Sequence, residues 1–416
     1  GLTIGAYLNW LYVAPRLRVY TQVSNDSITI PSYLESRLKQ SSRLLRVVSG
    51  LIILLFFTFY VSSGMVAGGV FFESSFGLDY HTGLLVVSAV VVAYTLFGGF
   101  LAVSYTDFLQ GLLMFLALIF VPIIGLFATG GLDSTVESIK EVNPNHLSLI
   151  AGTTTAGIIS SLAWGLGYFG QPHIIVRFMA ISSVKETKNA RRIGIGWMIL
   201  SLVGAISTAL VGLAYYKQHP ELTLTDPEAI FIALGQIVFH PFIAGLVLAA
   251  VLAAIMSTIS SQLIVTSSAL IEDLYKAFIK TDASDRTYVN YGRIAVLAVS
   301  IIAAVLAWEQ NETILGLVAF AWAGFGASFG PVILLSLYWK KITASGALSG
   351  MVVGAVTVVI WKANETLKDA LYEIVPGFLL ALIVTVVVSL LTYKPNAEIE
   401  KEFDDTIQLL KEERKK

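Results

Sequence analysis

The sequence contains no cysteine among its 416 residues. That absence excludes a disulfide scaffold, a zinc site with thiolate ligands and a cysteine nucleophile. Charged residues are also scarce, at 13% of the chain against about 25% in soluble globular proteins. The formal net charge of −1 offers no basic field for phosphates. An ordinary soluble enzyme, a disordered chain and a nucleic-acid-binding protein are therefore excluded.

Apolar residues take the place of the missing charge. They make up 56% of the chain, and the mean hydropathy is +0.77. One bilayer crossing needs about 20 apolar residues, so this content suffices for about eleven crossings. The sequence predicts an all-α polytopic membrane protein embedded in a lipid bilayer.

Eleven apolar segments are separated by charged or Pro-, Gly- and Asn-rich breaks. They are expected at 1–15, 43–72, 82–104, 107–129, 150–170, 190–216, 241–271, 288–308, 312–338, 343–361 and 373–393. The first stops at Pro15 and is too short to cross the membrane, so we expect the chain to begin inside a membrane helix. Residues 1–393 are predicted to form the transmembrane domain and residues 394–416 a cytoplasmic tail.

Basic residues alternate between the two sides of this arrangement. Of the 27 Lys and Arg, 23 fall in the odd-numbered loops and the tail, and four fall in the even-numbered loops. Cytoplasmic loops carry the excess of Lys and Arg. The pattern places the odd loops and the C-terminus in the cytoplasm, as expected for a multi-pass protein of the plasma membrane (the inner membrane of the cell).

The segment SLAWGLGYFGQPHIIVRF carries three glycines and Pro172 within eight residues. Glycine weakens a helix, and proline removes a backbone donor. A broken helix inside a membrane must line a cavity or be buried in protein, and secondary transporters hold cargo at such breaks. Trp164 and Tyr168 would share one face beside the break. The alternative is a kinked packing helix with two interfacial aromatic residues.

Hydroxyl side chains are concentrated in the segment VLAAIMSTISSQLIVTSSALIED. Hydroxyl and carbonyl oxygens suit a hard cation such as Na⁺. Alternatively, these side chains bond to carbonyl groups of their own helix. Glu272 and Asp273 follow beside Lys276 and are expected to form a solvated helix end.

Asp107 lies at the junction of two predicted segments, with no basic residue nearby in the sequence. An unpaired carboxylate at the membrane edge is a candidate functional residue. Asp107 could equally cap the N-terminus of the following helix.

Two further segments are expected to be helical. Residues 225–239 begin with Asp226 as a predicted N-cap and Pro227 in the first helical position, and they continue with amphipathic spacing. This helix would cap an outer vestibule or lie flat at the interface. The tail is expected to be a solvated or membrane-surface helix.

Catalytic constellations are not evident in the sequence. The five histidines fall singly and show no metal-ligand spacing, and no nucleophile stands near a base. We therefore expect a protein that is not an enzyme and that holds no organic cofactor.

Several motifs resemble those of a known family. GGFLAVSYTDFLQ, AAIMSTISSQLIVTSS and QPHIIVRFMAISSVKETKNARR resemble signatures of the sodium/solute symporter family. WGLGYFGQPHI, AWAGFGASFGP and SALIEDLYKAF are most similar to its proline-transporting bacterial members. The likeness runs from Gly1 to about Leu391. It implies a leucine-transporter-type core of five plus five helices in inverted repeat within thirteen helices, so two helices are expected to be missing before Gly1.

The resemblance also implies a function. It implies Na⁺ as the coupling ion, L-proline as the substrate, transport by alternating access, and no obligatory protein partner. Alternatives are another small amino acid, carboxylate or vitamin as cargo, or a transporter-like sensor, although the short tail has no room for a signalling module. By matching position, the substrate residues are Tyr60, Trp164, Tyr168 and Pro172, the Na⁺ residues are Ala254, Ser257 and Thr258, and the ion-coupling residue is Asp107.

Overall fold

The structure, a computed structural model, describes residues 1–24, 26–39, 43–275, 284–310 and 312–414. Every regular element among them is helical. Nine stretches of the described residues are long and apolar enough to cross a membrane. Eight helices provide them, and α5 contributes two: α4 (Leu44–Phe76), α5 (Tyr80–Ala128), α9 (Val184–Gln218), α11 (Pro241–Ser268) with its π-helical extension η5 (Ala269–Tyr275), α13 (Asp285–Leu306), α14 (Ile314–Tyr338), α15 (Ala344–Ala363) and α17 (Ile374–Thr392).

The predicted count of eleven is not confirmed, because segments 1–15 and 150–170 are not among the nine. Residues of the first form α1 (Leu2–Leu8), the π-helical turn η1 (Asn9–Val13) and α2 (Ala14–Val23). The apolar run of this segment ends at Pro15, but the helix does not end there. Pro15 lies in the first turn of α2, where its missing N–H is tolerated, and the helical path continues past it.

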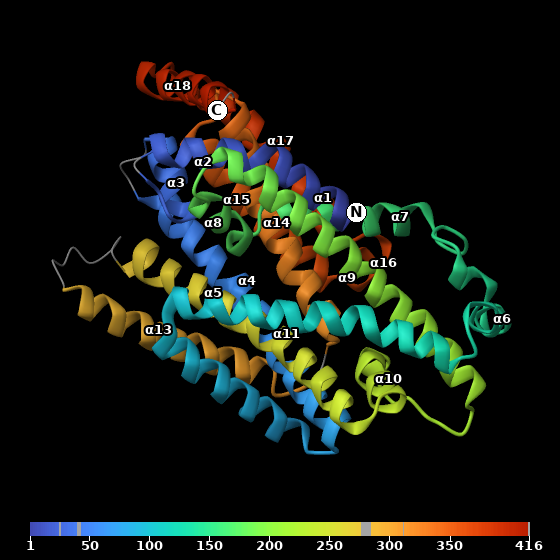
Figure 1. Ribbon diagram of the computed structural model, residues 1–416. Helices are drawn as coiled ribbons and strands as arrows, with labels where there is room; N and C mark the ends of the chain where they lie inside the picture. The colour runs from blue at the N-terminus through green and yellow to red at the C-terminus, as the bar shows by residue number, and fades with distance from the viewer. Residues whose placement is uncertain (25, 40–42, 276–283, 311, 415–416) are drawn as a thin grey trace.

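Helix α5 is bent rather than straight. Its 49 residues would extend about 74 Å as a straight helix, more than twice the about 30 Å of a hydrocarbon core. Figure 1 shows two arms that meet at a bend. Tyr94 on the first arm donates to the carbonyl of Met256 (2.9 Å), and Asp107 on the second accepts from Ser261 (2.9 Å). The predicted segments 82–104 and 107–129 are therefore the two arms of one bent helix.

Helix α14 forms the centre of the bundle. About 72% of its apolar stretch is buried, against 50% or less in the other eight. It packs against α4, α15 and α17, and against the short 3₁₀ helix η3 (Trp164–Phe169). The small residues of AWAGFGASFG allow this close approach.

The remaining helices lie between the long ones or at the two ends of the bundle. They are α3 (Ile30–Arg37), α6 (Leu132–Val142), η2 (Pro144–Leu147), α7 (Thr155–Ala163), α8 (Pro172–Ala180), η4 (Pro227–Ala229), α10 (Ile230–Val238), α16 (Glu365–Ala370) and α18 (Ala397–Glu413). The predicted helix at 225–239 is confirmed, with Asp226 as its N-cap. The carboxylate of Glu228 accepts from the backbone N–H groups of Ile314 and Leu315, both at 3.1 Å. The helix therefore sits over the start of α14.

The tail helix α18 docks on the bundle. Glu402 accepts a hydrogen bond from Ser24 (2.6 Å) and pairs with Lys39 (2.7 Å). Phe403 is buried and meets the ring of Tyr20 at 6.4 Å. The tail was expected to be solvated or to lie on the membrane surface, but one of its faces is covered by α2, with further contacts from α9 and from Lys39, which follows α3. Figure 1 places it at the end of the molecule opposite α6 and α10.

Candidate functional site

The predicted break in segment 150–170 is confirmed. Helix α7 gives way to η3 at Trp164, Gln171 has an extended backbone, and α8 begins at Pro172. The glycines weaken the α-helix, and Pro172 fits the first turn of a new one. The chain thus forms two half-helices joined by an unwound segment in the interior of the protein.

Aromatic side chains surround this segment. Trp164 stacks on Tyr372 with 5.2 Å between ring centroids, and Tyr168 meets Trp322 edge-on at 5.0 Å. Tyr60 on α4 belongs to the same apolar cluster as Trp164 and Tyr168. The ring of Tyr60 also meets that of His173, the residue after Pro172, at 6.0 Å. Three of the four residues that the family resemblance assigns to the substrate therefore lie on or beside the broken segment.

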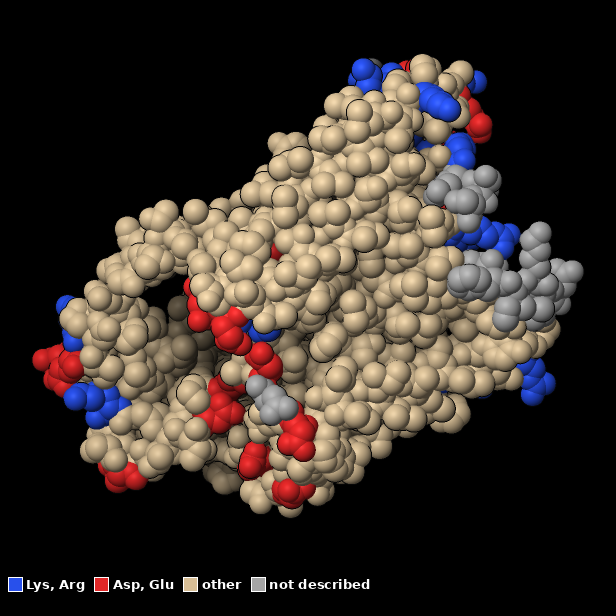
Figure 2. Space-filling model, turned by 180° about the vertical axis from the view of Figure 1, so that it is seen from behind, with Lys and Arg blue, Asp and Glu red and all other residues tan. Residues whose placement is uncertain are grey.

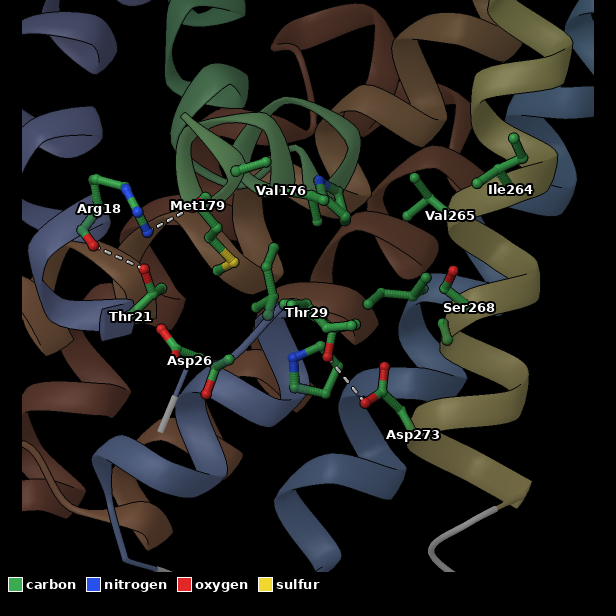
Figure 3. A pocket seen from close by; sticks show the side chains of 18 residues that line it. Arg18, Thr21, Asp26, Thr29, Val176, Met179, Ile264, Val265, Ser268 and Asp273 are labelled. Carbon is green, nitrogen blue, oxygen red and sulfur yellow. Dashed lines mark hydrogen bonds between the residues drawn. The ribbon is translucent and has the colours of Figure 1, made fainter. Parts of the chain in front are cut away.

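Pro172, the fourth, opens onto a separate cavity of about 420 Å³. The lining is mostly apolar and includes Val176, Met179 and, at one end, Thr29 and Asp273 (Figure 3). Trp164 and Tyr168 are not part of this lining. Pro172 therefore lies between the aromatic cluster and the cavity.

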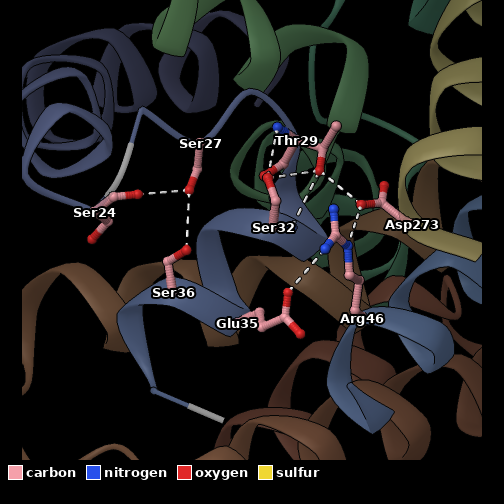
Figure 4. A network of polar contacts seen from close by, with 8 residues as sticks. All are labelled: Ser24, Ser27, Thr29, Ser32, Glu35, Ser36, Arg46 and Asp273. Carbon is pink, nitrogen blue, oxygen red and sulfur yellow. Dashed lines mark hydrogen bonds and ion pairs between the residues drawn. The ribbon is translucent and has the colours of Figure 1, made fainter. Parts of the chain in front are cut away.

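Asp273 does not form the solvated helix end that the sequence suggested. Its side chain is fully buried at the cavity. Oδ1 accepts from Arg46 Nε (3.1 Å) and from the Thr29 hydroxyl (3.0 Å), and Arg46 also binds Glu35 (3.1 Å), as Figure 4 shows. The prediction failed because these partners come from α3 and α4, far away in the sequence; Lys276 lies outside the described residues.

In α11, the hydroxyl groups of two predicted sodium residues bond to the backbone carbonyl of the third. The carbonyl oxygen of Ala254 accepts from Ser257 Oγ (3.1 Å) and from Thr258 Oγ1 (3.0 Å). The alternative reading of these hydroxyls, bonding within their own helix, is thus the arrangement observed. Three neutral oxygens lie close together here, and neutral oxygen ligands suit a hard cation.

Asp107 lies inside the second arm of α5, so its alternative role as a helix N-cap is wrong. The helix continues through the bend, and no free amide groups are left for Asp107 to cap. Its carboxylate Oδ2 accepts from Ser261 Oγ (2.9 Å) and lies 3.5 Å from Arg177 Nη2. Arg177 Nη2 also donates to Ser261 Oγ (3.1 Å). Asp107 therefore has a cationic partner, which its sequence neighbours did not reveal.

Helix α8 links the two groups of candidate residues. It begins with Pro172 beside the unwound segment, and its Arg177 reaches Asp107 and Ser261. The nine residues of α8 thus connect the aromatic cluster to α11 and α5.

Sequence reasoning missed several residues of this site. Some stood inside quoted motifs but carried no distinguishing signal, because their partners lie on other helices. They are Asn9, Gln171, Arg177, Ser261, Asp273 and Trp322.

The comparison with known families identifies the family of the chain. Residues 1–354 match the family model of the sodium:solute symporter family. The chain belongs to this family. It is 64% identical over 405 residues to the high-affinity proline transporter PutP of Bacillus subtilis, covering 97% of this chain and 85% of that protein. It is 50% identical over 423 residues to a sodium/proline symporter of Staphylococcus aureus, covering 99% of this chain and 82% of that protein.

Solved structures share the fold. The substrate-bound, outward-open structure of a Na⁺-coupled sialic acid symporter superimposes with a TM-score of 0.75 at 22% identity, covering 95% of this chain and 84% of that one. Inward-facing Mhp1 gives a TM-score of 0.55 at 14% identity, covering 97% and 87%. Both have the leucine-transporter fold. This symporter is therefore a multi-pass membrane transporter rather than an enzyme.

Proposed function

We propose that this symporter couples the entry of Na⁺ to the uptake of L-proline by alternating access across the plasma membrane. The observation that carries the proposal is the 64% identity to a high-affinity proline transporter over 97% of the chain. The relative named a sodium/proline symporter supports the choice of ion.

The proposal includes the architecture and orientation. A core of five plus five helices in inverted repeat agrees with the two structural relatives. Lys and Arg gather at the end that carries the tail, whereas Asp and Glu border a hollow at the other end (Figure 2). Glu73, Asp226, Glu228 and Glu312 line this hollow. By the positive-inside rule, the tail of residues 394–416 then faces the cytoplasm.

Proline would bind at the unwound segment. Trp164 and Tyr168 offer aromatic faces to its ring, and Tyr60 closes the same cluster from α4. The carboxylate would meet backbone N–H groups at the start of α8, where a helix N-terminus favours an anion. Pro172 lies at that terminus and also lines the cavity that extends to Asp273. We propose that this cavity is part of the path by which proline leaves toward the cytoplasm.

Sodium would bind on α11 through the Ala254 carbonyl and the hydroxyls of Ser257 and Thr258. Asp107, linked to α8 through Arg177, would couple the ion to the substrate site. One cation crossing about 100 mV supplies about 2.3 kcal/mol. That energy alone supports about 50-fold accumulation of a neutral zwitterion.

The test is uptake of radiolabelled proline by reconstituted protein in Na⁺, Li⁺ and K⁺. We expect uptake in Na⁺ and a large loss in Ser257→Ala and Thr258→Ala. Ser300→Ala is the matched control, because Ser300 on α13 is buried and bonds to the Val296 carbonyl of its own helix (2.7 Å). Uptake indifferent to the cation would remove the sodium assignment, and unchanged uptake in Trp164→Ala and Tyr168→Ala would remove the substrate site.

A further inference from the structure

The unwound segment Trp164–Phe169 is held by its backbone as well as by its rings. The indole N–H of Trp322 donates to the carbonyl oxygen of Trp164 (2.8 Å). The amide Nδ2 of Asn9 donates to the carbonyl oxygen of Tyr168 (2.9 Å). These donors come from α14 and from η1, so two separate helices hold the two residues that carry the proposed substrate rings.

Both donors are buried: Asn9 is fully enclosed, and Trp322 is 6% exposed. A carbonyl group released where a helix unwinds finds no water in a membrane interior, and an unpaired buried acceptor is costly. η3 keeps the i→i+3 hydrogen bonds of a 3₁₀ helix, so the Trp322 indole gives the Trp164 carbonyl a second donor, whereas Asn9 supplies the donor for the Tyr168 carbonyl at the end of η3.

The packing around these bonds is tight. Gly167 lies against the indole of Trp322, and a Cβ atom there would come within 1.9 Å of Nε1. Gln171, which is also fully buried, donates through Nε2 to the carbonyl oxygen of Trp322 (3.1 Å). Trp322 therefore donates to the carbonyl of Trp164 at one end of the break and accepts from Gln171 at the other.

We propose that Asn9 and Trp322 are positioning residues for the substrate site. By fixing the carbonyl groups of Trp164 and Tyr168, they set the orientation of the two rings and so the affinity for proline. This inference rests on the proposed function and extends it to residues that need not touch the cargo.

Two variants remove one hydrogen bond each and keep the packing. Trp322→Phe retains an aromatic ring without the indole N–H, and Asn9→Leu retains most of the volume without the amide. We expect each to raise the KM for proline about tenfold while the maximal rate stays within about twofold, since each variant removes one side-chain donor from a backbone carbonyl of η3. Asn9→Leu tests the second carbonyl by itself should Trp322→Phe fail to fold.

Tyr80→Phe is the matched control. The Tyr80 hydroxyl donates to the Ala307 carbonyl (2.8 Å), and Tyr80 is buried in a different apolar cluster. This variant also removes one donor and keeps the ring. We expect its KM to equal that of the wild type.

Hydrogen exchange gives a readout that does not depend on transport. We expect the backbone amides of residues 165–170 to exchange at least fivefold faster in Trp322→Phe and Asn9→Leu than in the wild type or Tyr80→Phe. An unchanged KM or unchanged exchange in these variants overturns the inference. If the wild type takes up no proline, the proposed function fails, and faster or unchanged exchange still decides whether the two side chains hold the segment.

Discussion

Asp273 and Arg46 form an ion pair with 3.1 Å between Oδ1 and Nε, although 227 residues separate them in the chain. The aspartate is fully buried, whereas 22% of the arginine side chain is exposed. Arg46 also holds Glu35 at 3.1 Å, and that carboxylate is 21% exposed. One guanidinium group therefore ties α4 to both η5 and α3.

Removing the arginine should cost much stability. Arg46→Ala leaves the Asp273 carboxylate buried without its charge partner, a change that costs about 3–5 kcal/mol. Glu35→Gln breaks only the more exposed pair and should cost at most about 1 kcal/mol. Thermal unfolding of the purified protein in detergent measures both. Equal losses in the two variants would contradict the burial argument.

Ser261→Ala should weaken sodium coupling. Ser261 Oγ donates to Asp107 and accepts from Arg177, so its loss removes hydrogen bonds to charged groups, each worth about 1.5–3 kcal/mol. We expect the Na⁺ concentration for half-maximal proline uptake to rise at least tenfold, as measured in a sodium titration of uptake. Ser300→Ala, which removes a bond within a single helix, should leave it unchanged. A similar rise in both variants would show that the effect is not specific to Asp107.

Gly5→Ala should destabilise the protein. A Cβ atom on Gly5 would lie 2.2 Å from the carbonyl oxygen and 2.4 Å from the Cα of Gly165, and backbone atoms cannot turn away as a side chain can. Overpacking of this kind costs about 1–3 kcal/mol. Gly111→Ala, in α5, meets no atom within 4 Å and should be neutral or stabilising, because alanine favours a helix over glycine. The midpoint of thermal unfolding should therefore fall in Gly5→Ala and stay the same or rise in Gly111→Ala.

Docking of the tail should weaken at high pH. Partial burial acts to lower the pKa of Lys39, but the hydrogen bond and charge of Glu402, with those of Glu398, outweigh it and raise the pKa above its ordinary 10.5. The stabilisation is complete below pH 10.5 and is lost as the pH rises through the higher folded-state value. Hydrogen exchange of α18 at rising pH, corrected for the intrinsic rate, should show release in this range. Lys39→Gln should loosen α18 already at neutral pH, and an identical profile in that variant would refute the assignment.

The sequence was informative wherever a signal was local. Apolar runs located most of the long helices, and the three glycines before Pro172 predicted where one of them breaks. The N-cap at Asp226 was correct because capping depends on residues within one turn.

Long-range pairing was not visible in the sequence. Asp107 looked unpaired because Arg177 is 70 positions away, and Asp273 looked solvated because Arg46 and Thr29 come from the other end of the chain. Trp322 belonged to a quoted motif, yet its role follows only from the packing of α14 on η3. Periodicity and composition describe single helices, whereas the site is made of contacts between them.

The bend in α5 makes one further point about α11. Tyr94 and Asp107, on opposite arms of α5, are fastened to Met256 and Ser261, and these attachment points flank Ser257 and Thr258. A cation shared by the Ala254 carbonyl and the two hydroxyls would require both O–H groups to turn their protons away from that carbonyl, within a stretch of helix anchored on both sides. We therefore expect sodium binding to change the angle between the two arms of α5, and a distance measured between labels on these arms would report it.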